Sequence, residues 1–182
     1  MSREAGGLPE RMIAIHAHLR AASIDHAFGG ALALAWCTQQ ARGTIDLDVN
    51  VFVGPERTDD MLAGLPDGIV ASARDRDALR REGQARLWWD ATPVDVFLNT
   101  TAFHEEIATR VRWEPFAGVE LPFLACEDLA VFKVFFNRTK DWADLEAMRD
   151  AGTLDVPAIA GVFVSFLGND DDRIVRLLSL GA

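Results

Sequence analysis

Three aspartates in two apolar segments are the residues best suited to chemistry. Asp46 and Asp48 lie two residues apart within Thr44–Val53, and Asp95 lies within Pro93–Leu98. Side chains two residues apart on a strand share a face, which would place the first two Cα atoms about 6.6 Å apart. Two carboxylates on one sheet face repel each other, and a divalent cation reverses that cost. Because Mg²⁺ prefers carboxylate and phosphate oxygens, the trio predicts a divalent-metal site able to support phosphoryl chemistry.

The segments around these acids have the alternation that is typical of strands. In Thr44–Val53 the apolar residues occupy one face, and Asp46 and Asp48 belong to the polar face. Pro93–Leu98 repeats this pattern, so Asp95 projects from the face opposite the apolar residues. If the two strands are neighbours in one sheet, the three carboxylates converge.

A glycine pair interrupts the chain ahead of the first acidic strand. Gly29 and Gly30 end a short predicted strand, Ile24–Phe28, and directly precede a predicted helix, Ala31–Gln39. Glycine lets backbone N–H groups approach a phosphate, and the N-terminus of a helix favours negative charge. A glycine pair or an Asp-x-Asp pattern alone is a weak signal. In this order along the chain, the two together indicate a site for a nucleoside triphosphate and its metal.

The stretch from Phe28-Gly29-Gly30-Ala31 to Arg42-Gly43-Thr44-Ile45-Asp46-Leu47-Asp48 resembles the DNA polymerase β-type nucleotidyltransferase superfamily. It looks most like the small branch that includes AbiEii-type abortive-infection toxins, which often reads GG-x-A and then R-x-T-x-D-x-D. One departure is Trp36-Cys37-Thr38-Gln39-Gln40, where relatives often carry a glycine. The resemblance continues at Asp95 and covers roughly Ile24–Met148. Its further matching residues are Lys133, Arg138, Lys140, Asp141 and Asp144.

This resemblance implies a metal-dependent nucleotidyltransferase that moves a nucleoside monophosphate from an NTP to an acceptor hydroxyl and releases pyrophosphate. Mg²⁺ or Mn²⁺ would be the cofactor. Carried over residue by residue, Gly29 and Gly30 would hold the triphosphate, and Asp46 and Asp48 would bind the metals. Asp95 would bind the catalytic metal and help to activate the acceptor hydroxyl.

Four more residues are candidate nucleotide contacts, each with a structural alternative. Arg42 and Thr44 flank the start of the first acidic strand, where surface charge and strand-start packing explain them equally well. Lys133 lies in a very apolar predicted helix, where a lysine must snorkel, pair or contact a ligand. Lys140 either contacts the nucleotide or forms a structural pair.

The order of the predicted elements indicates an α/β (α+β) fold with a mixed, twisted sheet flanked by helices. Residues 1–124 are expected to form the nucleotidyltransferase core. Residues 125–182 are predicted to form a C-terminal helical part that packs on the core as one compact unit. Asp141 and Asp144 are expected to hold the helical part against the α/β part. The helices predicted there are Glu127–Asn137, Lys140–Asp150, Val156–Leu167 and Asp171–Leu180.

The formal net charge of −10 limits the choice of acceptor. A protein that coats nucleic acid is normally basic, so a broad nucleic-acid surface is disfavoured, while contact with one RNA end is not. A tRNA end, a protein side chain and a small molecule stay open as acceptors, and a toxin-like role with an antitoxin partner rests on the resemblance alone. The alternatives are a catalytically silent module that binds a nucleotide or a partner, and a nucleotidyltransferase of the antibiotic-modifying kind. The arginines that could form a local basic patch are Arg74, Arg76, Arg80, Arg81 and Arg86.

The cysteines and histidines are expected to be structural. Cys37 and Cys126 belong to no CxxC pair or Cys/His cluster, so buried free thiols and a reducing compartment are expected. There is no signal-peptide pattern and no apolar run long enough to cross a membrane, which predicts a cytoplasmic protein. His16 and His18 are expected on the surface of an amphipathic helix, and His26 in a structural role.

Overall fold

The two acidic segments form neighbouring strands of one sheet. Strands β2 (Leu47–Val51) and β5 (Thr92–Leu98) run parallel, with Asp48 directly opposite Asp95. Val49, which follows Asp48, is fully buried, because successive side chains of a strand point to opposite faces. The predicted pairing of the two acidic strands is therefore confirmed.

Seven strands make up the sheet, which is mixed. The others are β1 (His26–Phe28), β3 (Ile69–Val70), β4 (Gln84–Trp89), β6 (Arg112–Phe116) and β7 (Val119–Phe123). Their order is β3-β4-β5-β2-β1-β7-β6. β1 runs parallel to β7 as β2 does to β5, and the other neighbouring pairs are antiparallel. A mixed sheet flanked by helices is the fold class that the sequence predicted.

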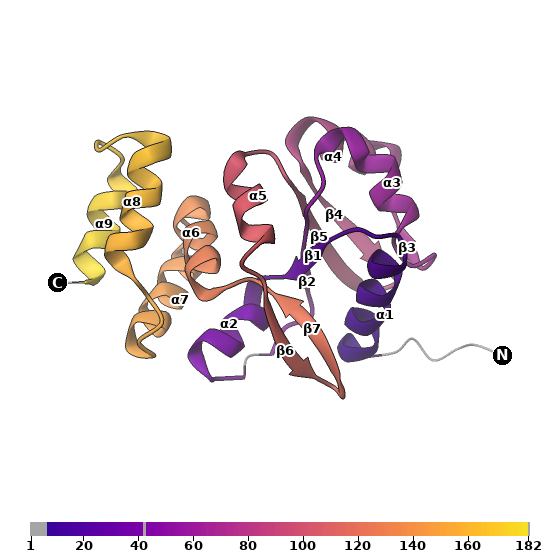
Figure 1. Ribbon diagram of the computed structural model, residues 1–182, viewed down its shortest axis with the longest axis horizontal. Coiled ribbons are helices and arrows are strands. Elements are labelled where there is room, and N and C mark those ends of the chain that lie inside the picture. The colour runs from indigo at the N-terminus through magenta and orange to yellow at the C-terminus, as the bar shows by residue number, and fades with distance from the viewer. Residues whose placement is uncertain (1–6, 42, 182) are drawn as a thin grey trace. The chain divides into compact units, whose positions relative to one another are not determined.

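The computed structural model describes residues 7–41 and 43–181 (Figure 1). Contacts within the chain group these residues into two units. The first contains residues 7–30 and 43–124 and holds the whole sheet, and the second contains residues 31–41 and 125–181 and is helical. Residues 31–41 thus group with the C-terminal helices, and the expected division at residue 124 stays a prediction.

Local signals in the sequence fix the helix that leads into β4. Ser72 and Asp75 form a reciprocal capping box at the start of this helix, α4 (Ala73–Glu82). It ends at Gly83, whose φ of +70° is the left-handed conformation that glycine adopts without strain. The chain therefore turns directly from α4 into β4. The other helices of the first unit are α1 (Leu8–Ala21), the 3₁₀ helix η1 (Pro55–Arg57), α3 (Thr58–Ala63) and α5 (Ala102–Ala108).

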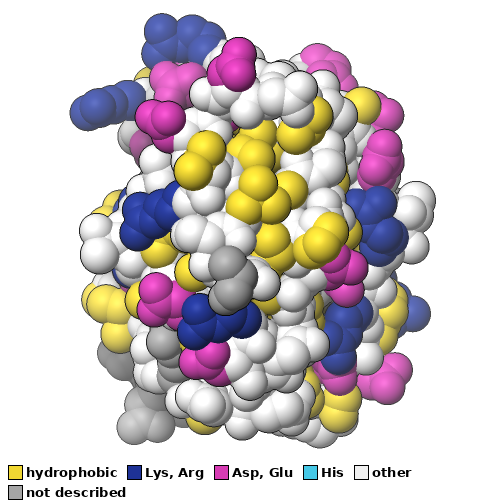
Figure 2. Space-filling view, turned by 90° about the vertical axis from the view of Figure 1, so that its left-hand side faces the viewer, with side chains coloured by type: hydrophobic (Ala, Val, Ile, Leu, Met, Phe, Trp, Pro, Cys, Tyr) yellow, Lys and Arg dark blue, Asp and Glu magenta, His cyan; other side chains and the backbone are white. Residues whose placement is uncertain are grey.

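The second unit packs its helices around an aromatic and aliphatic core that includes Trp142 and Leu145. Figure 2 looks at the side on which its last two helices lie and shows hydrophobic side chains gathered on that face. No described helix is long and apolar enough to cross a membrane. The helices are α2 (Gly30–Thr38), α6 (Cys126–Phe136), α7 (Thr139–Asp150), α8 (Val156–Leu167) and α9 (Asp172–Leu180). The exposed large apolar residues of α6, α8 and α9 are Phe135, Phe166, Leu167, Val175 and Leu178.

The cysteines form a disulfide, so the prediction of two buried free thiols is wrong. Cys37 near the end of α2 and Cys126 at the start of α6 are bonded, with their Cα atoms 5.6 Å apart. They are 89 residues apart in sequence, and only the packing of the helical unit brings them together. The expected reducing compartment rested on free thiols and loses that support.

Cys126→Ser should lower the free energy of unfolding by about 2–4 kcal/mol, because the disulfide closes a long loop of the unfolded chain. Urea unfolding monitored by far-UV circular dichroism measures this loss. Wild-type protein treated with reductant is the control and should match the variant. Two thiols that react with a maleimide in denatured, unreduced wild type would contradict the assignment.

Candidate functional site

A glycine turn passes directly beside Asp48. The backbone N–H of Gly29 donates to the carbonyl oxygen of Asp48 at 2.9 Å. Gly30 has a φ of +55°, and a Cβ placed there would lie 1.9 Å from a carboxylate oxygen of Asp48. A side chain at residue 30 would therefore displace the carboxylate of Asp48 and strain the backbone, and glycine avoids both costs. The glycines and Asp48 are neighbours as expected, and phosphate binding by Gly29 and Gly30 stays a prediction.

Asp46 lies just before β2, so strand alternation does not fix its position. Its backbone N–H donates to the hydroxyl oxygen of Thr44 at 3.2 Å, and that hydroxyl lies 3.3 Å from the carbonyl oxygen of Asp46. Thr44 thus orders the backbone around Asp46 through hydrogen bonds to the main chain. Arg42, the other candidate at this segment, lies outside the described residues. Nucleotide contacts by Thr44 and Arg42 stay predictions.

An arginine of β4 holds two of the three acids. The Nε and Nη2 atoms of Arg86 donate to the two carboxylate oxygens of Asp95, each at 2.7 Å. Nη2 also lies 3.4 Å from a carboxylate oxygen of Asp46. The hydrogen bonds to Asp95, together with the negative charges of Asp95, Asp46 and Asp48, raise the pKa of the Arg86 guanidinium above its ordinary value. The Arg86 guanidinium beside the acids therefore stays positively charged.

The chemistry of these donors fits a divalent metal, although no three His, Cys, Asp or Glu side chains of the described residues are grouped closely enough to hold one. The oxygens are all carboxylate, which is the donor type that suits Mg²⁺ and Mn²⁺. One nitrogen of Arg86 lies within reach of both Asp95 and Asp46, so a cation already occupies the space between them. Asp46, Asp48 and Asp95 carry the donor atoms that such a metal would need, but as they lie here the three are not close enough together to hold it.

Residue patterns do not indicate that Arg86 faces Asp95, because that contact depends on the position of one turn. β4 and β5 are joined at Asp90 and Ala91, which pairs Trp89 with Thr92 and Arg86 with Asp95. A turn one residue later would have placed Arg86 opposite a different residue of β5. The signal that identifies the true turn is Asp90, whose φ of +52° suits a short polar residue.

The two candidate lysines lie in the helical unit. Lys133 on α6 is buried, and its Nζ lies 2.6 Å from a carboxylate oxygen of Asp144 and 3.9 Å from one of Asp141. Asp141 also accepts from the Arg138 Nε at 2.7 Å. These contacts confirm the pairing alternative for Lys133 and tie α6 to α7. Lys140 is exposed on α7, and nucleotide binding by either lysine stays a prediction.

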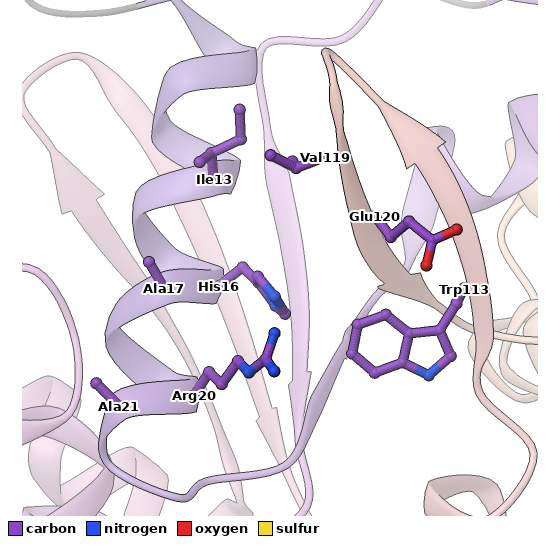
Figure 3. Close-up of a pocket in the computed structure, with 8 residues that line it drawn as sticks. All are labelled: Ile13, His16, Ala17, Arg20, Ala21, Trp113, Val119 and Glu120. Carbon is purple, nitrogen blue, oxygen red and sulfur yellow. The ribbon is translucent and has the colours of Figure 1, made fainter.

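A groove of about 790 Å³ lies between α1 and the β6–β7 hairpin of the first unit. It contains none of the predicted site residues. Figure 3 shows the side chains of His16 and Arg20 on α1, with Trp113 and Glu120 on the hairpin across the groove. His16 is buried at the base of this groove, so its predicted surface position is wrong. The hairpin, which the sequence did not define, covers that part of α1.

The hydrogen bonds of His16 and His26 assign their protons. Nδ1 of His26 lies 3.1 Å from the carbonyl oxygen of Ile24, which can only accept, so this nitrogen donates. Nε2 of neutral His26 must then accept from Nδ1 of His16, at 3.0 Å. Burial lowers the pKa of His26 to about 4, and burial together with the charge of Arg20 lowers the pKa of His16. His26 therefore has the structural role that we expected.

Lys133→Met should destabilise the protein by about 3–5 kcal/mol, because it leaves the carboxylate of Asp144 buried without its cation. Chemical unfolding at neutral pH measures the change. Arg149→Gln removes an exposed arginine that pairs with Asp150 on the same helix. This control should change stability by less than about 0.5 kcal/mol. Equal effects of the two substitutions would contradict the account.

His26 should make the protein less stable as the pH falls from 6.5 towards 4. The unfolded chain takes up a proton in this range that the folded chain excludes, so the free energy of unfolding should drop by about 2 kcal/mol between pH 7.5 and pH 5. Urea unfolding at the two pH values measures the drop. It should shrink in His26→Gln and persist in His18→Gln, whose histidine is exposed on α1. An unchanged drop in His26→Gln would refute the assignment.

Comparisons with known proteins identify the fold. No family model matches the chain, and no curated protein matches it. The solved structure of the antibiotic-resistance factor ANT(2'')-Ia matches with a TM-score of 0.55 at 12% identity, covering 93% of this chain and 94% of that chain. An antigenic nucleotidyltransferase-like protein from Paracoccidioides brasiliensis matches with a TM-score of 0.52 at 13% identity, covering 94% and 86%. The chain therefore has the nucleotidyltransferase fold.

Proposed function

We propose that this protein is a metal-dependent nucleotidyltransferase that moves a nucleoside monophosphate from an NTP to an acceptor hydroxyl. One observation carries the proposal. Asp48 and Asp95 lie directly opposite each other on parallel strands, and a guanidinium cation lies between Asp95 and Asp46. The glycine turn beside Asp48 and the nucleotidyltransferase fold support the same function.

Phosphoryl transfer depends on positioning and on neutralising charge more than on covalent chemistry by the protein. In the proposed reaction the acceptor oxygen bonds to the α-phosphorus as the bond to the bridging oxygen breaks, and pyrophosphate leaves. Bound Mg²⁺ or Mn²⁺ supplies positive charge to the phosphate oxygens. Asp46, Asp48 and Asp95 would hold the metal, and Asp95 would also accept the proton of the attacking hydroxyl. Gly29 and Gly30, which carry no side chains, would let the triphosphate approach the backbone of this turn.

The class of acceptor is the least constrained part of the proposal. Two of the five arginines that could form a basic patch, Arg76 and Arg80, pair with Asp59, and Arg86 pairs with Asp95. This pairing weakens the case for an RNA acceptor and favours a protein or a small molecule. The likeness to an antibiotic-resistance factor supports the small molecule, and the AbiEii-like motifs support a toxin that an antitoxin partner would control.

A catalytically silent module that binds a nucleotide or a partner is the second candidate function. It is favoured by the neutralisation of Asp95 by Arg86, which satisfies that carboxylate without a metal. It is disfavoured by the presence of all three acids in the chain, with Asp48 beside the glycine turn and Asp95 opposite Asp48. Binding of NTP without transfer in the assay below would select this candidate.

Asp95→Asn and Asp46→Asn should each reduce transfer of label from α-³²P-NTP by at least about 100-fold, because each removes a carboxylate from the metal site. The assay incubates the protein with each NTP, Mn²⁺ or Mg²⁺, and total tRNA, lysate protein or a small-molecule extract. Asp90→Asn is the matched control, because Asp90 pairs with Arg11 at the β4–β5 turn instead of facing the acids. Full transfer by both site variants would show that the site is assigned to the wrong residues.

A further inference from the structure

We propose that Arg86 is an internal counter-ion that occupies the acid site by pairing with Asp95, which we call the closed state. Arg86 must leave Asp95 before a metal ion binds. This inference deepens the proposed function and rests on it, since it takes the three acids to be metal ligands. It assigns to Arg86 control of metal binding, which none of the predicted site residues provides.

Arg86 contacts Asp95 through two hydrogen bonds. The planar guanidinium of arginine matches the two oxygens of a carboxylate, and Arg86 makes both of these hydrogen bonds to Asp95 at 2.7 Å. The same group extends to Asp46, 3.4 Å away. A divalent cation that used the carboxylates of Asp95 and Asp46 would lie against this guanidinium. Two cations repel each other at that distance, so only one of them occupies the site at a time.

The side chain of Arg86 can move, although the backbone of this residue is fixed in β4. β4 and β5 pair along their length, which sets the position of Arg86 opposite Asp95. The side chain of Arg86 is 49% exposed and that of Asp95 is 20% exposed, whereas those of Lys133 and Asp144 in the helical unit are 8% and 10% exposed. Water and ions reach the Arg86 side of the pair, where they screen its charge and can compensate the loss of its partner. The Arg86–Asp95 pair is therefore displaceable, and the Lys133–Asp144 pair is permanent.

Displacement of Arg86 from Asp95 would change the affinity of the acid site for a metal ion. When only a fraction of the molecules has the binding-competent conformation, the apparent dissociation constant rises by the inverse of that fraction. A closed state that predominates would therefore weaken metal binding in the absence of nucleotide. A guanidinium that has left Asp95 is also a good partner for phosphate oxygens. Metal and NTP should therefore strengthen each other's binding, and this cooperativity should depend on Arg86.

Titration with Mn²⁺ in the absence of nucleotide, followed by electron paramagnetic resonance of the free ion, tests the proposal. Arg86→Gln should bind Mn²⁺ roughly 5-fold more tightly than wild type, because it lacks the competing cation. Arg86→Lys keeps the charge and loses the two-point hydrogen bond, so its affinity should lie between the two. Arg80→Gln is the matched control, since Arg80 has similar exposure and also pairs with an aspartate, Asp59. It should bind Mn²⁺ as wild type does.

A gain in Mn²⁺ affinity that is equal in Arg86→Gln and Arg80→Gln would reflect net charge alone and would overturn the proposal. So would an Arg86→Gln affinity equal to or weaker than that of wild type, or no Mn²⁺ binding by any variant. If Arg86→Gln fails to fold, tighter binding by Arg86→Lys than by wild type supports the proposal, and equal or weaker binding overturns it. The addition of a non-hydrolysable NTP should tighten Mn²⁺ binding more in wild type than in Arg86→Gln.

The Mn²⁺ titration and the label-transfer assay together separate this inference from the proposed function. Tighter Mn²⁺ binding by Arg86→Gln without any transfer of label would uphold the counter-ion and reject the reaction. Transfer that depends on Asp95, together with an Mn²⁺ affinity that Arg86→Gln leaves unchanged, would uphold the reaction and reject the counter-ion.

Discussion

The repulsion between carboxylates on one face of the sheet is the constraint on which the site depends. Pairing of β2 with β5 places Asp48 directly opposite Asp95, and Asp46 lies one residue before β2. Neighbouring negative charges repel each other, and a cation among them offsets that repulsion. Arg86 supplies that cation through its two hydrogen bonds to Asp95. The proposed metal site and its control by Arg86 are two consequences of the same electrostatic requirement.

The Lys133–Asp144 and Arg86–Asp95 contacts differ in burial and therefore in role. Lys133 and Asp144 are both buried in the helical unit, where the loss of either charge leaves the other without compensation. In the sheet unit Arg86 is half exposed and Asp95 is one-fifth exposed, so water can reach the guanidinium and replace its partner. The first contact is suited to holding helices together, and the second is suited to exchange with a ligand. The structural role of the Lys133 pair and the exchangeable role of the Arg86 pair differ because of burial. Burial of a particular side chain could not be read from the sequence.

Much of the site followed from local patterns, and the remainder depends on contacts that such patterns do not encode. Alternation identified the two acidic strands and the face that Asp48 and Asp95 share, and the glycine pair identified the turn beside Asp48. The pairing of Arg86 with Asp95 depends on the position of a two-residue turn, and a shift of one residue changes every partner across the hairpin. The disulfide joins residues 89 positions apart, so spacing gave no indication of it.

The most direct measurement is a crystal structure with Mn²⁺ and a non-hydrolysable NTP, using the anomalous scattering of manganese to locate the ion. The account predicts an anomalous peak coordinated by Asp46, Asp48 and Asp95, with the triphosphate beside Gly29 and Gly30. It also predicts that the guanidinium of Arg86 has left Asp95. A nucleotide bound elsewhere, or a bound nucleotide with Arg86 still on Asp95 and no manganese at the acids, would contradict it.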